Sequence, residues 1–193
     1  METLMDAPDC DLMMRLAAGD DLALNTLMDR WSGRVVAFLY RMTGQREVAI
    51  DLAQETFVKL YQARARYRPQ GNFSTWLFAI AANLARNHAR WKIRHPTVSL
   101  DATNPDGTAA FSDPADPDPT PGEAALTHEQ TEAVNAAILE LPLELREALT
   151  LFVYEGMGYA EIANLSRCSP KAVETRIYRA RQILKERLKD LRS

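Results

Sequence analysis

The side chains best suited to chemistry in this chain gather on one predicted helix near the C-terminus. Those that can bond to base edges or phosphates lie on one face of this helix or beside it: Lys171, Thr175, Arg176, Tyr178, Arg179, Arg181 and Gln182. Lysine and arginine bind phosphates, and these side chains together with threonine and glutamine form hydrogen bonds to base edges in the major groove. The pattern therefore predicts a surface that binds duplex DNA.

Ser169 and Pro170 mark the start of that helix, because a serine hydroxyl caps the first turn and proline suits the first helical position. Apolar residues then form one stripe along the helix: Val173, Ile177, Ala180, Leu184, Leu188 and Leu191. Upstream, Ile162 and Ala163 suit a short helix that crosses its neighbour closely. A short helix, a tight turn and a longer helix form a helix-turn-helix, whose second helix enters the major groove. The alternative is a helical hairpin whose basic face is only solvated.

A second set of candidate residues lies between residues 47 and 94. Asp51, Gln54 and Glu55 share one face of a helix predicted over 47–67. The loop 67–73 then leads into a helix that is predicted to run from Ser74, its cap, to Arg94. This helix carries a polar stripe and an apolar face: Asn83, Arg86, Arg90 and Arg94, beside Trp76, Leu77, Ile80, Leu84 and Trp91. An aromatic loop beside an arginine stripe favours single-stranded nucleic acid, because bases stack or insert while the backbone follows the positive charge.

No catalytic constellation accompanies these residues. The three histidines, His88, His95 and His128, have no plausible ligand partners, and no nucleophile or phosphate-loop motif occurs in the sequence. We therefore expect a protein that is not an enzyme and that holds no metal or cofactor. Cys10 and Cys168 lie far apart and lack CxxC spacing, which favours structural thiols in a reducing cytoplasm.

The predicted fold class is all-α, because the apolar residues on both sides of residues 96–124 recur at helical spacing and nothing alternates as in a strand. Residues 96–124 hold six of the ten prolines and six acidic residues. Such a segment cannot bury enough apolar surface to offset its ordering entropy. We expect two small helical domains, a four-helix domain over 1–95 and a helix-turn-helix domain over 125–193, joined by a flexible acidic linker. In the second domain, helices are expected near 126–140, 143–154, 159–165 and 170–190.

Charge is segregated along the chain. The formal net charge is −3, whereas domains that bind nucleic acid are usually basic. Residues 56–100, however, contain eight basic and no acidic residues, and residues 167–193 contain nine basic and three acidic ones. Two such blocks predict two electropositive surfaces, against the alternative of ordinary solvated helix faces. The sequence shows no export signal and no run of about 18 apolar residues, so we expect a cytoplasmic protein without membrane insertion.

Two parts of the sequence resemble a known family. The segments DLAQETFVKLY and FSTWLFAIAANLARNHAR resemble region 2 of an extracytoplasmic-function (ECF) sigma factor of the sigma-70 family. The segment AILELPLELREALTLFVYEGMGYAEIANLSRCSPKAVETRIYRARQIL is similar to region 4 of that family. The resemblance covers about residues 10–95 and 125–190, in the family's order. It implies a bacterial transcription initiation factor that binds core RNA polymerase and opens promoter DNA.

The resemblance also implies roles for particular residues. The −35 element would be bound as duplex by residues around the start of the last helix: Ser169, Lys171, Ala172, Thr175, Arg176 and Arg179. A base flipped from the non-template strand of the −10 element, and the phosphates near it, would be held by Tyr67, Arg68, Gln70, Gly71, Asn72, Asn83, Arg86 and Arg90. The coiled coil of the polymerase β′ subunit would contact Asp51, Gln54, Glu55 and Phe57. The β flap of the polymerase and an anti-sigma factor clamped between the two domains are further implied partners.

Three residues depart from the family pattern. Arg167 replaces the glycine that is common in the turn, where a left-handed non-glycine residue costs roughly 1 kcal/mol. Ser166 stands where leucine is usual, and Glu174 stands where a basic residue is common. These departures bear on the base preference rather than on the fold. Two other functions stay open at this point: a repressor or activator that binds DNA without polymerase, and a protein that mainly serves as the target of an inhibitory partner.

Overall fold

The structure is a computed structural model that describes residues 8–68, 72–95 and 131–189. Every regular element in those three ranges is a helix, which confirms the predicted all-α fold. None of the helices in the described ranges is long and apolar enough to cross a membrane. The predicted linker over 96–124 lies outside the described residues.

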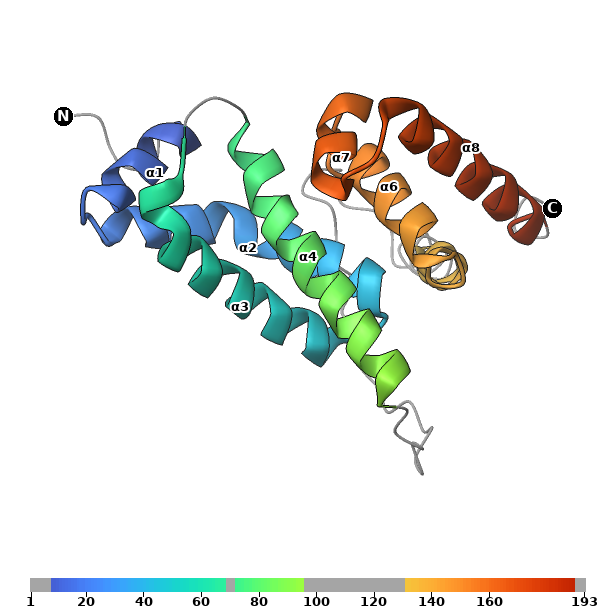
Figure 1. Cartoon of the computed structure of the whole chain (residues 1–193). Coiled ribbons are helices and arrows are strands. Elements are labelled where there is room, and N and C mark those ends of the chain that lie inside the picture. Colours follow the sequence, from blue (N-terminus) through green and yellow to red (C-terminus); the bar gives the residue numbers. More distant parts are fainter. Residues whose placement is uncertain (1–7, 69–71, 96–130, 190–193) are drawn as a thin grey trace, which may run out of the picture.

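The N-terminal domain consists of α1 (Asp9–Ala17), α2 (Leu22–Thr43), α3 (Arg46–Ala63), a short 3-10 helix (Arg64–Arg66) and α4 (Phe73–Arg94). In Figure 1 these helices occupy the left-hand half of the molecule, with α4 crossing toward the second half. Their buried faces meet in one apolar core that is centred on the edge-to-face ring pair of Phe38 and Phe78, whose centroids lie 5.3 Å apart. The helical periodicity of the sequence locates this core because each helix buries only its apolar stripe.

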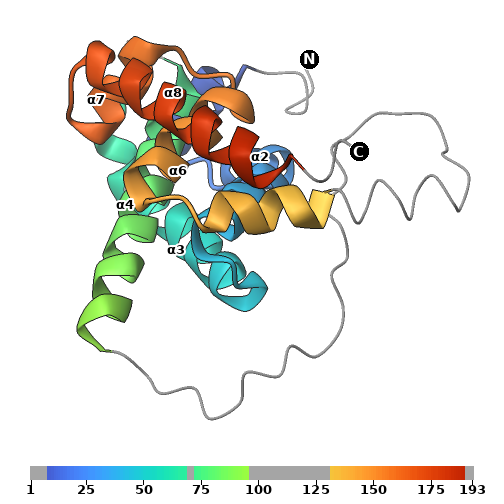
Figure 2. The same ribbon diagram turned by 90° about the vertical axis from the view of Figure 1, so that its right-hand side faces the viewer.

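The N-cap of helix α4 lies two residues earlier than predicted. Asn72 precedes the first helical residue, Phe73, so Ser74 lies inside the first turn and is not the N-cap. The first half of α4 is packed into the core, and its last turns extend beyond the rest of the domain (Figures 1 and 2). Trp91, which the periodicity places on the apolar face, is 49% exposed there and stacks on the ring of His95. The apolar stripe is therefore longer than the surface that covers it.

The C-terminal domain comprises helical residues 131–139 followed by α6 (Leu143–Val153), α7 (Tyr159–Ser166) and α8 (Pro170–Arg187). The predicted start of α8 is confirmed, because the Ser169 hydroxyl accepts a hydrogen bond of 3.1 Å from the backbone N–H of Ala172. Val173, Ile177 and Ala180 bury the apolar stripe of this helix against the rest of the domain. Helices α7 and α8 thus form the predicted helix-turn-helix.

The two domains are in contact, which the sequence does not indicate. Helix α6 packs against α2, and α7 packs against α4 (Figures 1 and 2). Gly44, which ends α2 in the left-handed conformation with φ of 73°, lies so close to the second domain that a Cβ there would be 2.9 Å from Cδ1 of Leu139. The backbone conformation therefore favours glycine at this position, and a Cβ there would also displace the end of the Leu139 side chain.

Candidate nucleic-acid interfaces

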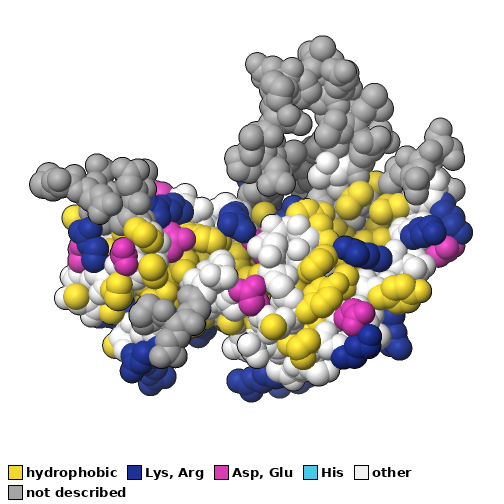
Figure 3. Space-filling model, turned by 90° about the horizontal axis from the view of Figure 1, so that it is seen from above, with side chains coloured by type: hydrophobic (Ala, Val, Ile, Leu, Met, Phe, Trp, Pro, Cys, Tyr) yellow, Lys and Arg dark blue, Asp and Glu magenta, His cyan; other side chains and the backbone are white. Residues whose placement is uncertain are grey.

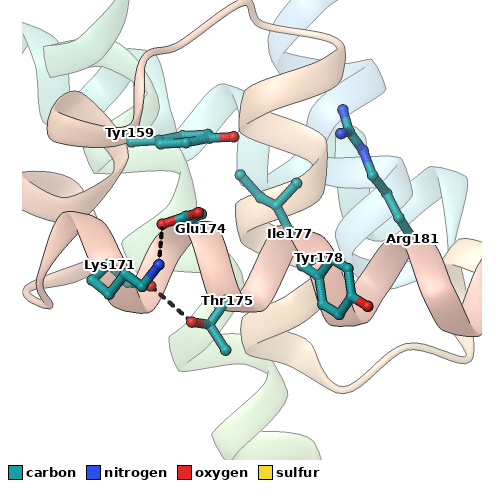
Figure 4. A pocket seen from close by; sticks show the side chains of 7 residues that line it. All are labelled: Tyr159, Lys171, Glu174, Thr175, Ile177, Tyr178 and Arg181. Atoms are coloured by element: carbon teal, nitrogen blue, oxygen red, sulfur yellow. Dashed lines mark hydrogen bonds and ion pairs between the residues drawn. The ribbon is translucent and has the colours of Figure 1, made fainter.

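The outer face of α8 is the first candidate interface, and it is open. Figure 4 shows Lys171, Thr175 and Tyr178 along one side of this helix, with Glu174 turned toward Lys171. The Lys171 side chain is 80% exposed, and its ammonium group lies 2.8 Å from the Glu174 carboxylate. Together with Tyr159 these residues line a shallow groove of about 440 Å³. Exposed donors at the N-terminal end of a recognition helix can contact base edges and phosphates.

The remaining residues predicted for this interface differ in how accessible they are. Arg179 is exposed, Ala172 is half-buried, and the Ser169 hydroxyl is used as the helix cap. Arg176 points back into the domain, where its guanidinium lies 2.6 Å from Glu144 of α6 and 3.5 Å from the Cys168 sulfur. Arg176 therefore contributes positive charge to this face while its side chain is bound within the domain.

The turn between α7 and α8 has the backbone conformation that its position in the motif predicts. Arg167 has φ of 52° and ψ of 49°, the left-handed conformation in which glycine is favoured. It is the one non-glycine residue with positive φ in the part of the chain that the structure describes. The prediction that an arginine occupies a strained turn position here is confirmed, at a cost of roughly 1 kcal/mol.

The second candidate interface is a groove of about 620 Å³ between α4 and the end of α7. The polar stripe predicted on α4 lines this groove, since Asn83, Arg86 and Arg90 all face it. Trp76 and Lys59 line it on the same side. The opposite wall comes from the helix-turn-helix itself: Asn164, Leu165, Ser166 and Arg167. An aromatic ring, an amide and several cations in one groove suit a nucleobase with its phosphate.

Within this groove Arg86 is bound by a carboxylate of the other domain. Its Nη1 atom donates to both carboxylate oxygens of Glu147, at 2.7 and 2.9 Å. The Glu147 side chain is only 5% exposed, and the Ser166 hydroxyl also donates to it, at 2.7 Å. The charged carboxylate is thus removed from water and satisfied by partners from both domains, as a buried charge requires.

The loop end of α4 is bound in the same way. The Asn72 amide and the Thr75 hydroxyl each donate to one Glu161 oxygen at 2.9 Å, and the backbone N–H of Gly158 donates to the other oxygen. These hydrogen bonds lower the pKa of Glu161 below its usual value, and the bond from Gly158 has the largest effect. Glu161 consequently stays ionised and bonded across the domain boundary at neutral pH.

Several residues predicted to hold a flipped base do not lie in this groove. Tyr67 is buried between Phe73 and Trp76, and burial raises the pKa of its phenol. Its predicted position on a DNA-binding loop surface is therefore corrected to a position in the core. Arg68 is exposed and donates to nearby backbone carbonyls, whereas Gln70 and Gly71 lie outside the described residues.

A third candidate surface runs along α3. Asp51, Gln54 and Glu55 are exposed on one face, as predicted for polymerase contact. Phe57 does not belong to that face, because it is buried in the domain core at 4% exposure. The sequence contains the signal for this correction: Ala53, Phe57 and Leu60 form a buried helical stripe. The exposed face also carries two apolar side chains that sequence reasoning missed, Ile50 and Val58.

The surface of the C-terminal domain mixes positive charge with exposed apolar side chains. Seen from above, Lys and Arg side chains alternate with hydrophobic ones on this domain, at the right of Figure 3. Large exposed apolar residues of the domain include Val153, Tyr159 and Tyr178. Such mixed patches are typical of surfaces that bind other macromolecules.

Comparison with known proteins places these features in a family. Residues 27–94 match the family model of sigma-70 region 2, and residues 131–184 match that of sigma-70 region 4. The chain is 35% identical to RNA polymerase sigma-H factor of Pseudomonas aeruginosa, with 97% of each chain covered. It is 32% identical to the ECF RNA polymerase sigma-E factor of Escherichia coli K12, with 93% of this chain and 94% of that protein covered.

Solved structures agree with this placement. The chain is similar to CnrH in its complex with the cytosolic domain of CnrY, with a TM-score of 0.67, 27% identity and coverage of 96% of this chain and 99% of the other. It shares its fold with the sigma factor RpoE of Bartonella quintana in complex with the anti-sigma factor NepR, with a TM-score of 0.66, 23% identity and coverage of 86% and 96%. On the strength of these similarities over nearly its full length, the chain belongs to the sigma-70 family and, within it, to the ECF RNA polymerase sigma factors.

Proposed function

We propose that this chain is an alternative sigma factor that binds core RNA polymerase, recognises the −35 and −10 promoter elements, opens the −10 region and starts transcription. Its role is to bind and deform DNA rather than to catalyse a reaction. The observation that carries the proposal is the pair of donor-rich helix faces, on α8 and on α4, in a chain similar to curated sigma factors over 97% of its length.

The face of α8 would bind the −35 element as duplex. Lys171, Thr175 and Arg179 lie on the exposed side of a helix whose start is fixed by the Ser169 cap. A recognition helix held in this way presents its first turns to the major groove. Arg176 would reach DNA after leaving Glu144, and in the bound position seen here it stabilises the domain.

The groove of α4 would capture a base from the non-template strand of the −10 element. Flipping a base out of its stack costs a few kcal/mol, and a pocket with hydrogen bonds to the base edge offsets that cost. Asn83 supplies an amide for the base edge, while Arg86 and Arg90 lie close enough along the helix to hold adjacent phosphates. Asn72 and Arg68, at the loop end of α4, would extend this surface.

The α3 surface would contact the coiled coil of the polymerase β′ subunit. Three polar side chains, Asp51, Gln54 and Glu55, lie beside the apolar Ile50 and Val58, a composition that suits a protein interface. The C-terminal domain would bind the β flap. An anti-sigma factor is a further proposed partner, because the similar RpoE of Bartonella quintana forms a complex with the anti-sigma factor NepR.

Run-off transcription tests the proposal directly. Purified chain is mixed with core RNA polymerase and a library of randomised promoters, and transcripts are sequenced. Promoter-specific transcripts and co-elution of the chain with core enzyme are the expected results. A repressor or activator that acts without polymerase would bind duplex DNA but would neither co-elute with core enzyme nor start transcripts, and that outcome would overturn the proposal.

A further inference from the structure

The groups that would bind the −10 element are occupied by carboxylates of the chain's own C-terminal domain. We propose that Glu147 and Glu161 form an intramolecular latch that holds the C-terminal domain against α4 in the free chain and that must open before the −10 strand can bind. We call the contacts of Glu147 and Glu161 with α4 and Asn72 the latch. The inference rests on the proposed role of α4 in DNA binding and adds its regulation.

The contact between Arg86 and Glu147 is the first half of the latch. A carboxylate presents paired oxygen acceptors to a guanidinium in the way that a phosphate does. Glu147 accepts two hydrogen bonds from Arg86, at 2.7 and 2.9 Å. Arg86 lines the same groove as Asn83 and Arg90. The guanidinium that would bind a DNA phosphate is therefore already paired with a carboxylate.

Glu161 forms the second half, at the N-terminal end of α4. It accepts hydrogen bonds from Asn72 and Thr75 across the domain boundary while its second oxygen caps the start of α7 through Gly158. Asn72 belongs to the loop region proposed to hold the flipped base. One carboxylate thus joins the start of α7 to the start of α4.

A separate set of contacts holds the opposite edge of the domain boundary, between α2 and α6. Arg146 donates to the backbone carbonyls of Met42, at 2.6 Å, and of Leu141, at 2.9 Å, and also to that of Leu139. The Arg41 guanidinium lies 3.6 Å from the centre of the Tyr154 ring. These contacts do not involve the proposed DNA-binding groups. They form an edge about which the domains can separate at the latch.

The burial of Glu147 indicates that the latch opens in one step. If Arg86 left while Glu147 stayed in place, a carboxylate with 5% exposure would lose its counter-charge. An unpaired buried charge is strongly destabilising. The favourable alternatives are therefore a closed state with both partners bonded and an open state with both hydrated, and DNA or polymerase shifts the balance by binding only the open one.

The first experiment compares two doubly substituted full-length chains. Glu147→Gln with Glu161→Gln removes both latch charges, and glutamine still caps α7 because it serves at this position of a capping box. The control, Glu140→Gln with Glu186→Gln, makes the same charge change in ion pairs with Arg187 and Lys189 that lie wholly within the C-terminal domain. The readouts are the radius of gyration from X-ray scattering and binding of a labelled, randomised pool of short single-stranded DNA.

The latch variant is expected to have a larger radius of gyration and to bind the single-stranded pool roughly tenfold more tightly, within the usual range of coupling between sites. The control is expected to match the native chain in both readouts. Unchanged dimensions and unchanged affinity in the latch variant would overturn the inference.

A second experiment holds the latch closed with a covalent cross-link. In a Cys10→Ser, Cys168→Ser background, Thr75→Cys and Glu161→Cys are joined by a reducible bismaleimide linker. The linked chain is expected to lose single-strand binding, keep its binding to duplex DNA, and regain single-strand binding after reduction. Equal single-strand binding before and after reduction would overturn the inference even if the first variant folded poorly.

The two proposals fail in distinguishable ways. If the latch variant expands but neither it nor the native chain binds the single-stranded pool or supports run-off transcription, the −10 assignment of α4 is wrong, and the regulatory inference falls with it. If the native chain supports transcription and the latch variant neither expands nor binds more tightly, the sigma-factor function stands and the latch alone is rejected.

Discussion

The two helix faces proposed to bind DNA are in opposite states. The outer side of α8 is exposed, and its lysine is paired only with a neighbour on the same helix. The groove of α4 is walled on one side by the other domain, and its Arg86 is paired with a buried carboxylate 61 residues away in sequence. On the proposed function, the first face is accessible to duplex DNA as it stands, whereas the second would require a rearrangement before a strand could enter.

If the proposed function and the latch are right, this difference implies an order of promoter binding. Duplex DNA would need no opening of the protein, since the outer face of α8 lies away from the domain boundary. A single strand in the α4 groove would need both an unpaired base and separated domains, so the protein and the DNA would open together in the complex with polymerase. Premature binding of unrelated single strands by the free chain would thereby be suppressed.

The largest expected effect tests whether the edge held by Arg146 supports the closed state. Arg146→Ala leaves three backbone carbonyls without the guanidinium that donates to them. The same guanidinium is partly removed from water, and this burial lowers its pKa. We expect the free energy of unfolding to fall by about 3 kcal/mol. Urea denaturation followed by circular dichroism measures it. Arg146→Lys should lose less, and equal stability of the native and alanine chains would contradict the assigned role.

The next effect separates the two DNA-binding faces. Asn83→Ala should lower opening of the −10 region about thirtyfold, because an amide contact to a base edge contributes on the order of 2 kcal/mol. Binding of −35 duplex should not change. Permanganate reactivity of the promoter in the presence of core polymerase measures opening. Gln62→Ala, an exposed amide at the end of α3, is the control, and reactivity equal to that of the native chain in both variants would refute the role of Asn83.

What the sequence predicts correctly is local. The Ser169 cap and the exposed face of α8 follow from residue type and helical spacing, whereas the left-handed Arg167 follows from the glycine that the family has in this turn, and the structure confirms all three. Tyr67 and Phe57 were placed on surfaces by family resemblance, although their spacing from other apolar residues fits the core in which they lie. Resemblance transferred a role to them that their burial in this structure does not support.

The latch could not have been predicted from the sequence. Glu161 has the spacing from Gly158 that a capping box requires, but nothing nearby in sequence marks Glu147 as buried or either carboxylate as bonded to the N-terminal domain. Their partners Arg86 and Asn72 lie 61 and 89 residues away, across a segment of unpredictable path. Periodicity identifies the faces of a helix but does not say which distant element covers a polar face.

A smaller expected effect, on DNA binding, tests the exposed face of α8. Lys171→Ala should weaken binding to −35 duplex and reduce the salt dependence of binding by about 0.9 in the log–log slope, the value for one phosphate contact. Fluorescence anisotropy over a series of salt concentrations measures the slope. Lys185→Ala, an exposed lysine nearer the C-terminal end of α8, is the matched control. The open state of this face would be in doubt if the slope of the Lys171 variant matched that of the native chain.

A substitution in the turn between α7 and α8 should give a small gain in stability. Arg167→Gly should raise the free energy of unfolding by about 0.5 kcal/mol, since relief of the left-handed strain is partly offset by the greater freedom of glycine in the unfolded chain. Thermal and urea denaturation measure the change. Arg167→Ala retains the strained conformation and should show no gain. If alanine stabilised the chain as much as glycine, the strain at this position would not be the cause.

The smallest expected effect concerns Glu161, the half-buried member of the latch. Its pKa is lowered mainly by the hydrogen bond from Gly158 and next by that from Thr75. A lowered folded-state pKa means that Glu161 contributes stability fully above the usual glutamate value of about 4.3, and that this contribution is lost as the pH falls through the lowered value. Thr75→Val removes one donor without changing charge, so the pKa of Glu161, followed by carboxyl-carbon NMR, should rise toward the usual value. The pKa should stay where it is if the domains are already apart in solution, because Gly158 belongs to the same domain as Glu161 and only Thr75 and Asn72 report on closure.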